Sequence, residues 1–242
     1  MISQVHLGFW RKLITQQLNL HNSQQIEVPR RQMISQVHLG YERNFTVKKQ
    51  SPQIDSSSYE YFLLVAEISA ALWVHILTFE ITLRNFIHSS LRAIYKNNTW
   101  WLIPGLLFKG DAEVVGKVIR RLSHRKIDQT EGIFLSNLSF SFWIELLSKR
   151  YHQKIWNKLL KYFPVYPGRR EEFHRKAREI RNLRNSIAHH GPILRRNLLR
   201  DLTYLNELTS LLNPTLAIEV EKRSRALELI QNAQLVGSGG GI

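Results

Sequence analysis

The chain has 242 residues, 43% of them hydrophobic and 10% aromatic, so it can bury a substantial core and is not globally disordered. Its 34 Lys and Arg residues outnumber its 19 Asp and Glu residues, and the net charge of +15 favours a polyanionic partner. The absence of cysteine excludes disulfides, thiolate metal sites and cysteine nucleophiles. Because the first 25 residues also lack the apolar segment of a secretory signal, we expect a cytoplasmic protein.

The N-terminal region contains the same octapeptide twice. The sequence MISQVHLG occupies residues 1–8 and recurs at residues 33–40, where it begins with the second of the two methionines. The residues after the two copies diverge, which excludes a repeat array. A local duplication or a translation start at Met33 explains the pattern, and whether residues 1–32 are natively translated stays open.

Composition divides the chain into three parts. Residues 48–58, KKQSPQIDSSS, are polar and include a proline, which indicates a linker. The chain ends in a glycine-rich stretch that cannot contribute to a core. We therefore predict an N-terminal extension over residues 1–56, a folded domain over residues 57–229 and a flexible tail over residues 230–242.

Residues 62–79 form the first long apolar segment of the predicted domain. They are apolar enough to be considered as a membrane span, but Glu67 and His75 interrupt them, and they run directly into Glu80 and Arg84. We therefore predict a buried helix and no membrane partner, and we keep a membrane segment as a third, weaker interpretation.

The later apolar residues recur with the period of a helix. One apolar stripe runs from Tyr151 to Phe163, and two more lie in residues 171–188 and 198–212. Proline and glycine pairs separate these segments, and no stretch alternates convincingly with period two. The pattern predicts an all-α fold of six or seven helices.

Most of the excess positive charge falls in one region. Residues 149–200 contain 15 basic and three acidic residues, so they carry +12 of the net charge of +15. Aromatic residues lie between these charges, a mixture that could follow a phosphate backbone and stack on unpaired bases. The alternative is an ordinary solvated helix surface whose aromatics belong to the core. The candidate RNA-binding residues are Lys154, Lys158, Lys161, Arg195 and Arg196.

One arginine falls on an apolar face. At 100° per residue, Arg184 lies on the same line as the apolar residues of the helix 171–188. On the earlier helix, Glu80 lies about 40° from the centre of the apolar face. An unpaired buried guanidinium is too costly, so Glu80 is its candidate partner, and losing Glu80 should then cost about 3–5 kcal/mol. A purely structural ion pair is the alternative interpretation.

Two histidines follow this arginine. Asn185 comes directly after Arg184, and His189 and His190 precede the helix-ending Gly191. The negative potential at a helix C-terminus favours a protonated imidazole, which suits acid–base chemistry near neutral pH. The chain shows no recognised metal-ligand spacing, serine elbow or glycine-rich phosphate loop, so we predict no metal site and no cofactor.

These residues resemble a known motif. RNSIAH, residues 184–189, matches the HEPN superfamily motif, an arginine that is followed by a polar residue and separated from a histidine by four to six residues. Three longer stretches resemble the Abi-like, or abortive infection, branch of that superfamily, and the paired tryptophans at 100–101 fit as well. These stretches are ISAALWVHILTFEITLRNFIH, SFSFWIELLSKRYHQKIW and FHRKAREIRNLRNSIAHHGPILRRNL. The resemblance covers about residues 57–229, and the N-terminal extension has no counterpart in it.

The resemblance implies a HEPN-type helical bundle with extra helices, a homodimer, and a metal-independent endoribonuclease of the toxin type in bacterial phage defence. Arg184 would stabilise charge on the phosphate while the ribose 2′-hydroxyl attacks it, and Asn185 would orient a reacting group. His189 is the first choice for proton transfer, with His190 left open. Glu80 and Arg84 match the family's first-helix acidic and basic positions.

The runner-up interpretation is a non-catalytic RNA-binding or adaptor protein of the same fold, because fold alone does not establish activity. In that interpretation Arg184 and Glu80 serve structure, and the basic region serves affinity. The RNA target, the activating signal and an antitoxin or other regulatory partner stay open.

Overall fold

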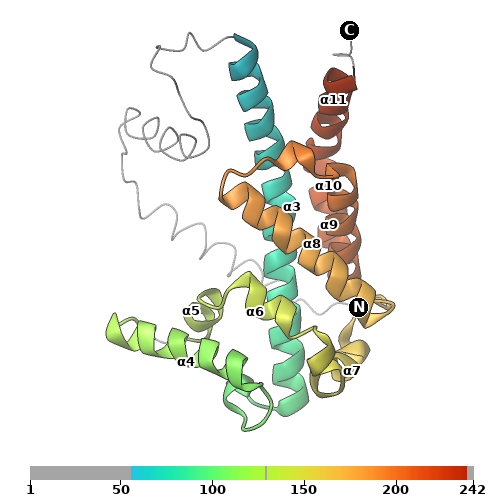
Figure 1. Ribbon diagram of the computed structural model, residues 1–242. Coiled ribbons are helices and arrows are strands. Elements are labelled where there is room, and N and C mark those ends of the chain that lie inside the picture. The colour runs from blue at the N-terminus through green and yellow to red at the C-terminus, as the bar shows by residue number, and fades with distance from the viewer. Residues whose placement is uncertain (1–55, 129, 239–242) are drawn as a thin grey trace. The chain divides into compact units, whose positions relative to one another are not determined.

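The computed structural model describes residues 56–128 and 130–238, and the secondary structure of these residues is helical without strands, which confirms the predicted all-α fold (Figure 1). The predicted extension and its duplicated octapeptide lie outside the described residues. The nine α-helices of the described part are α3 (Ser56–Tyr95), α4 (Lys109–His124), α5 (Glu131–Ser136), α6 (Phe140–Glu145), α7 (Asn157–Leu159), α8 (Arg170–Ala188), α9 (Leu198–Leu212), α10 (Pro214–Arg223) and α11 (Ala226–Ser238). The short 3₁₀ or π turns are η2 (Trp100–Leu102), η3 (Lys149–Tyr151), η4 (His152–Trp156), η5 (Leu160–Tyr162) and η6 (Ile193–Arg195).

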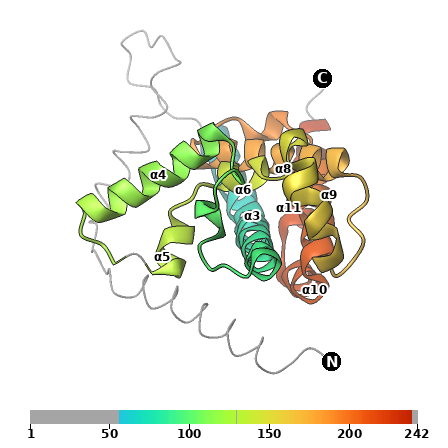
Figure 2. The ribbon, with the colours of Figure 1, turned by 90° about the horizontal axis from the view of Figure 1, so that it is seen from below.

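The 40-residue helix α3 is the element on which the others pack. It is about 60 Å long. Helices α6, α8, α9 and α11 all contact it, and in Figure 2 the helices α9, α10 and α11 gather on one side of α3 while α4 and α5 lie on the other. Helix α8 crosses α3 (Figure 1). The residues on its core face recur every three or four positions. Those that are fully buried are Ile68, Leu72, Ile76, Phe79, Leu83, Ile87 and Leu91.

The opposite face of α3 is largely exposed in its first half, where Trp73, Val74 and Leu77 reach solvent. The expectation of a buried helix over 62–79 therefore holds for one face only. Within the described residues, α3 is also the helix that is long and apolar enough to cross a membrane. The relevant window has a mean hydropathy of 1.9, and 28% of it is buried.

Helices α8 and α9 form a hairpin joined through η6. The predicted segment 198–212 matches the bounds of α9, and α8 begins one residue before the predicted 171. Leucines of α9 pack between α3 and α8, so this hairpin holds α8 against the flank of α3.

The segment from 149 to 162 is less regular than its apolar stripe suggests. It passes through the 3₁₀ turn η3, the π turn η4, the short helix α7 and the 3₁₀ turn η5. The π turn accommodates the consecutive residues Ile155 and Trp156, both of which are buried. The apolar residues therefore share one face although the segment is not a continuous α-helix.

A buried polar cluster ties this segment to the start of α4. The Tyr151 hydroxyl donates to Asp111 Oδ2 at 2.5 Å and accepts from the backbone N–H of Phe108 at 2.9 Å. Arg150 completes the cluster with an ion pair of 2.9 Å to Asp111. Burial, together with the hydrogen bond to Asp111, raises the pKa of Tyr151, so the hydroxyl stays protonated and keeps donating.

The C-terminal boundary predicted at residue 229 is wrong. Helix α11 continues to Ser238, and Ile230 is 1% exposed, so residues 230–238 are not a flexible tail. Between residues 230 and 234 only Ile230 is buried and Ala233 is partly buried, so this part of the sequence shows little of the apolar periodicity that marks a core helix.

A buried histidine contact joins α3, η2 and α5. Trp100 Nε1–H donates to His88 Nδ1 at 3.2 Å, so the ring proton lies on Nε2, which donates to Glu131 at 2.8 Å. Burial lowers the pKa of His88, although Glu131 acts in the opposite direction. Protonation of Nδ1 would break the bond from Trp100.

This geometry predicts a loss of stability in acid. Because the folded-state pKa of His88 is below its ordinary value of 6.5, the contact contributes fully above that pH and is lost as the pH falls below it. In His88→Gln, the amide can still accept from Trp100 and donate to Glu131 without titrating. Urea unfolding at about pH 7.5 and about pH 5.5 should show a smaller acid-induced loss for this variant than for the wild type. The exposed His124→Gln is the control, and equal losses in the wild type and His88→Gln would contradict the assignment.

Candidate functional site

Helices α3 and α8 bring Glu80, Arg84 and Arg184 together. Arg184 Nε lies 3.9 Å from Glu80 Oε2, which confirms the ion pair expected from the helix positions. The Arg184 guanidinium also lies 5.9 Å from the centroid of the Trp73 ring. Arg84, one turn after Glu80 on α3, acts on the same carboxylate electrostatically.

The pair is less buried than the helix positions predicted. The side chain of Arg184 is 35% exposed and that of Glu80 is 26% exposed. The buried face of α8 includes Lys176 and Leu183, which rotate its centre toward α9 and leave Arg184 at the edge. The figure of about 3–5 kcal/mol applies to fully buried pairs, so this exposure lowers the cost that we expect for losing Glu80.

The groups at this contact retain capacity to bind an anion. Burial raises the pKa of Glu80, while the two guanidiniums of Arg184 and Arg84 oppose that shift. Arg184 Nε is a buried N–H without a hydrogen-bond acceptor in the described structure. Arg84 is also desolvated, and its Nε makes a 3.3 Å bond to Asn85. The Nη groups of Arg184 and Arg84, which make no hydrogen bond within the described residues, can bind a phosphate oxygen strongly.

The motif histidines lie at the end of α8. His189 is its C-cap. The backbone N–H of His190 donates to the carbonyl of Ile187 at 3.1 Å, and that of Gly191 donates to the carbonyl of Ser186 at 2.7 Å. This is a Schellman ending, and it explains the left-handed φ of 53° at His190. The side chains of both histidines are exposed.

The left-handed backbone at His190 is not itself a sign of function. Lys96 and Lys126 have similar positive φ values, 49° and 53°, just after the ends of α3 and α4. The same way of ending a helix therefore recurs at positions that the motif does not include.

A single chain does not place His189 against Arg184. Five residues of helix separate them by about 140° around the axis and about 7.5 Å along it. Asn185 is exposed and lies about 100° from Arg184. The motif residues therefore form two separate features. One is the contact of Arg184 on α8 with Glu80 on α3, and the other is the pair of exposed histidines at the end of α8.

The predicted RNA-binding lysines are at a different place. Lys154 Nζ donates to the carbonyl of Gly105 at 2.7 Å, and Lys158 Nζ donates to the Tyr95 hydroxyl at 2.9 Å. Tyr95 is the last residue of α3, 15 residues after Glu80, which is about 22 Å along the helix. The structure therefore separates the lysines from the Arg184 contact.

Lys161 belongs to the same end of the molecule, with its ammonium 5.2 Å from the centroid of the Tyr162 ring. Each of the three lysine ammoniums lies over an aromatic ring, Lys154 at 4.4 Å from Phe108 and Lys158 at 4.6 Å from Tyr95. Such rings hold the charges in place without neutralising them.

The two candidate arginines after α8 differ. Arg196 Nε donates to Asp201 at 2.7 Å, and its Nη2 reaches Glu179 at 3.2 Å. Asp201 is fully buried, so Arg196 is its counter-ion and joins the start of α9 to α8. Arg195, by contrast, is exposed. This geometry gives Arg196 a structural role and leaves Arg195 accessible to a ligand.

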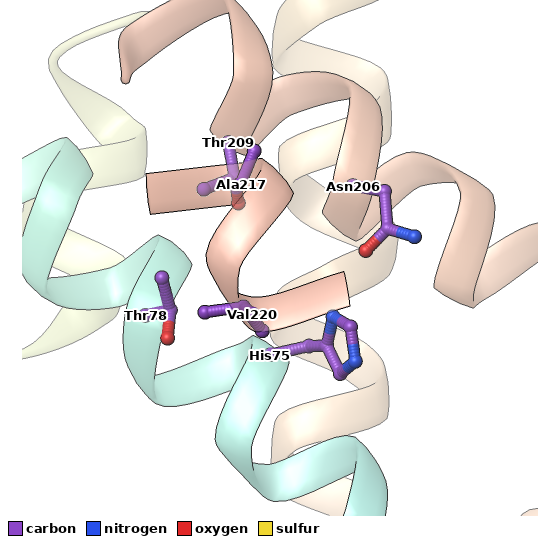
Figure 3. A pocket seen from close by; sticks show the side chains of 6 residues that line it. All are labelled: His75, Thr78, Asn206, Thr209, Ala217 and Val220. Carbon is purple, nitrogen blue, oxygen red and sulfur yellow. The ribbon is translucent and has the colours of Figure 1, made fainter. Parts of the chain in front are cut away.

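One arrangement that sequence reasoning missed is the contact between α3, α9 and α10 (Figure 3). His75 Nε2 lies 2.6 Å from Ser224 Oγ, and Asn206 also bonds to the imidazole. A serine, a histidine and an orienting amide suit nucleophilic catalysis. Here, however, the adjoining cavity has no space for a water molecule, and Ser224 Oγ accepts from the N–H of Ala226 at the start of α11. The contact is structural, and the 149 residues between its partners explain why no local pattern revealed it.

Among residues 56–128 and 130–238, no group of three or more His, Asp or Glu side chains is placed to hold a metal ion. No protein-family model matches the chain, and comparison with characterised proteins and with solved structures finds no similar one.

The partial exposure of the Glu80–Arg184 pair yields a stability prediction. Because burial raises the pKa of Glu80, ionising it costs free energy above its ordinary pKa of 4.5. Glu80→Gln removes that cost. The Arg184 side chain, which is 35% exposed, stays hydrated without its ion-pair partner. We expect the free energy of unfolding to change by about 1 kcal/mol or less in urea titrations. Glu67→Gln, at an exposed position of the same helix, is the control. A loss of about 3 kcal/mol or more would show that the pair is a buried structural bridge.

Proposed function

We propose that this protein is a metal-independent endoribonuclease of the HEPN type, acting in bacterial phage defence, that cleaves RNA through its own 2′-hydroxyl. The observation that carries the proposal is the contact of Arg184 with Glu80. A partly exposed guanidinium with an unused donor faces a desolvated carboxylate, on the helix that ends in two exposed histidines. These are the residues that the HEPN-like motif selects.

The proposed reaction needs phosphate stabilisation and two proton transfers. The ribose 2′-oxygen attacks phosphorus, the bond to the 5′-oxygen breaks, and the products are a 2′,3′-cyclic phosphate and a 5′-hydroxyl. Arg184, with Arg84 beside it, stabilises the extra negative charge on the phosphate. A histidine takes the proton from the 2′-hydroxyl and a histidine returns one to the leaving oxygen. DNA, which lacks the 2′-hydroxyl, is not a substrate.

A second copy of the chain completes the proposed site. Since His189 points away from Arg184 in one chain, the helix end of a partner subunit can supply the proton-transfer group. The exposed apolar face of α3, which includes Trp73, Val74 and Leu77, lies directly before Glu80 and suits an interface. Between Tyr59 and Arg84 this helix contains no basic residue, so it contributes none of the positive charge that would repel a second copy.

A non-catalytic RNA-binding protein is the second candidate. It is favoured by the separation of about 22 Å along α3 between the lysines and Glu80, and by the separation of His189 from Arg184 within one chain. In that case the chain holds RNA at the lysines, and the Arg184 contact has no reaction to perform.

Cleavage of total RNA by the purified protein in EDTA separates the two candidates. We expect cleavage by the wild type and at least a hundredfold loss in Arg184→Ala and in His189→Ala, because each loses one essential contribution. Arg178→Ala, an exposed arginine on the same helix, should retain activity. If the wild type binds RNA but leaves it intact in EDTA and in magnesium, the non-catalytic interpretation holds.

The helix ending distinguishes the two histidines. His190 has a left-handed backbone, which glycine adopts with less strain, so His190→Gly should raise the free energy of unfolding by about 0.5–1 kcal/mol. If His189 transfers the protons, this variant is also fully active, as measured by cleavage of a labelled oligonucleotide. A stable but inactive His190→Gly would assign the chemistry to His190 instead.

The lysines should contribute affinity and not chemistry. Replacing Lys154, Lys158 and Lys161 together by glutamine removes up to three phosphate contacts. We expect weaker RNA binding and a salt dependence of log Kd that is shallower by about two to three, with the same bonds cut. The control is a triple glutamine variant at the exposed Lys109, Lys117 and Arg125, around α4. An unchanged slope would mean that the lysines face away from the RNA.

A further inference from the structure

A cavity at the other end of α8 is separate from the Arg184 contact. It has a volume of about 190 Å³ and lies between the loop before α8, the first half of α8 and the second half of α9. This is below the roughly 300 Å³ of a site for a drug-sized ligand and corresponds to about six water molecules. A single flat ring system is the size of group that it suits. Its lining residues are Tyr166, Pro167, Gly168, Glu172, Phe173, Lys176, Glu207, Leu208 and Leu211.

The polar groups of this cavity are organised around one buried lysine. Lys176 is 8% exposed, and its ammonium contacts Oε1 of Glu172 at 2.9 Å and Oε1 of Glu207 at 2.5 Å. Within the described residues, Oε2 of neither carboxylate has a hydrogen-bond partner. The hydrogen bond from Lys176 lowers the pKa of Glu172, so this group is ionised at neutral pH and can only accept hydrogen bonds.

The charge of the cavity determines which part of a nucleic acid it can take. Its lining holds two carboxylates and one ammonium, so a phosphate placed among them meets two like charges, although the guanidiniums of Arg169 and Arg175 also act on Glu172. The same acceptors favour a neutral ring that carries N–H donors. Phe173 and Leu208, each 1% exposed, form the apolar floor of the cavity.

The rim supplies a stacking surface. Tyr166 is 76% exposed, the highest value among the large hydrophobic residues of the described structure. Gly168, two residues later, has a φ of 72°, a conformation that side-chain-bearing residues rarely adopt. The turn at Gly168 therefore sets where Tyr166 lies relative to α8. An exposed aromatic ring beside a small cavity is the arrangement on which an unpaired base stacks.

Short stretches of chain connect the cavity to the lysines and to the proposed reaction site. Lys161 precedes Tyr166 by five residues, so their Cα atoms are at most about 18 Å apart. Glu172 precedes Arg184 by 12 residues of the same helix, about 18 Å along its axis. An RNA strand that follows α8 from the lysines to Arg184 would pass the cavity.

We infer that this cavity binds one unpaired guanine of the RNA substrate, several nucleotides from the cleaved bond. The inference rests on the proposed function. The guanine ring stacks on Tyr166, and its two adjacent donors, N1–H and the 2-amino group, bond to the carboxylates of Glu172 and Glu207. Adenine, cytosine and uracil cannot present two such adjacent donors, so the cavity selects guanine by its Watson–Crick edge.

The test measures binding alone. Labelled uridine octamers with one central guanosine, inosine or uridine, and with 2′-O-methyl groups on every ribose to prevent cleavage, are titrated against the full chain. We expect the guanosine octamer to bind about tenfold more tightly than the uridine octamer, with inosine, which lacks the 2-amino group, in between. Tyr166→Ala, at an exposed position that folding does not depend on, should abolish most of this difference.

Glu207→Gln gives the sharper result. The amide oxygen of glutamine must turn to Lys176, so its NH₂ faces the guanine donors and the preference for guanosine should disappear. Affinity for the uridine octamer should stay constant or rise slightly, because a negative charge near a polyanion is lost. Glu113→Gln, an exposed acid on α4, is the charge-matched control, and thermal midpoints verify that each variant is folded.

The outcomes separate this inference from the proposed function. Equal gains in affinity for both octamers in Glu207→Gln, or wild-type binding without base preference, would overturn the guanine site and leave RNA cleavage standing. No binding of any octamer, together with intact total RNA, would overturn both. A guanosine preference in a protein that cleaves nothing supports the cavity and overturns the nuclease.

Discussion

The burial of one continuous face of α3 is the constraint from which the candidate site follows. Seven side chains on that face have no exposed surface, and burying each contributes about 1.5–3 kcal/mol. Helices α6, α8, α9 and α11 all gain their apolar contacts there, so α3 cannot rotate or shift without breaking the core. Its register therefore fixes Glu80 and Arg84 on the flank where α8 presents Arg184.

The charged groups of the structure divide by how completely they are satisfied. Asp111 and Asp201 are buried, and both have arginine partners at 2.9 Å or less. The contact of Arg184 with Glu80 is longer, at 3.9 Å, and it leaves a buried N–H without an acceptor. The first kind of contact stabilises the fold, whereas the second costs free energy that the core must offset. Incompletely satisfied groups of this kind concentrate at functional sites.

The period of the apolar residues predicted the features that depend on the face of a single helix. It placed α9 within its observed bounds, and it paired Glu80 with Arg184 across two helices. It overestimated the burial of Arg184 because the apolar positions alone did not show that Lys176 turns inward, stabilised by two carboxylates from different helices. The contacts of His75 with Ser224 and of His88 with Trp100 depend on tertiary packing, so no local spacing could have revealed them.

If the proposed function holds, α8 sets how far the bound base lies from the cleaved bond along the RNA. Its 19 residues span about 28 Å, with the guanine cavity near its first turns and the motif residues at its last. The helix dipole favours a protonated histidine at the C-terminal end, where the motif histidines lie. A strand held by the lysines and by one base can therefore extend toward Arg184 while its phosphates stay clear of the acidic cavity. Because the core fixes α8 against α3, the distance between the recognised base and the cleaved bond is set by the fold and not by the RNA.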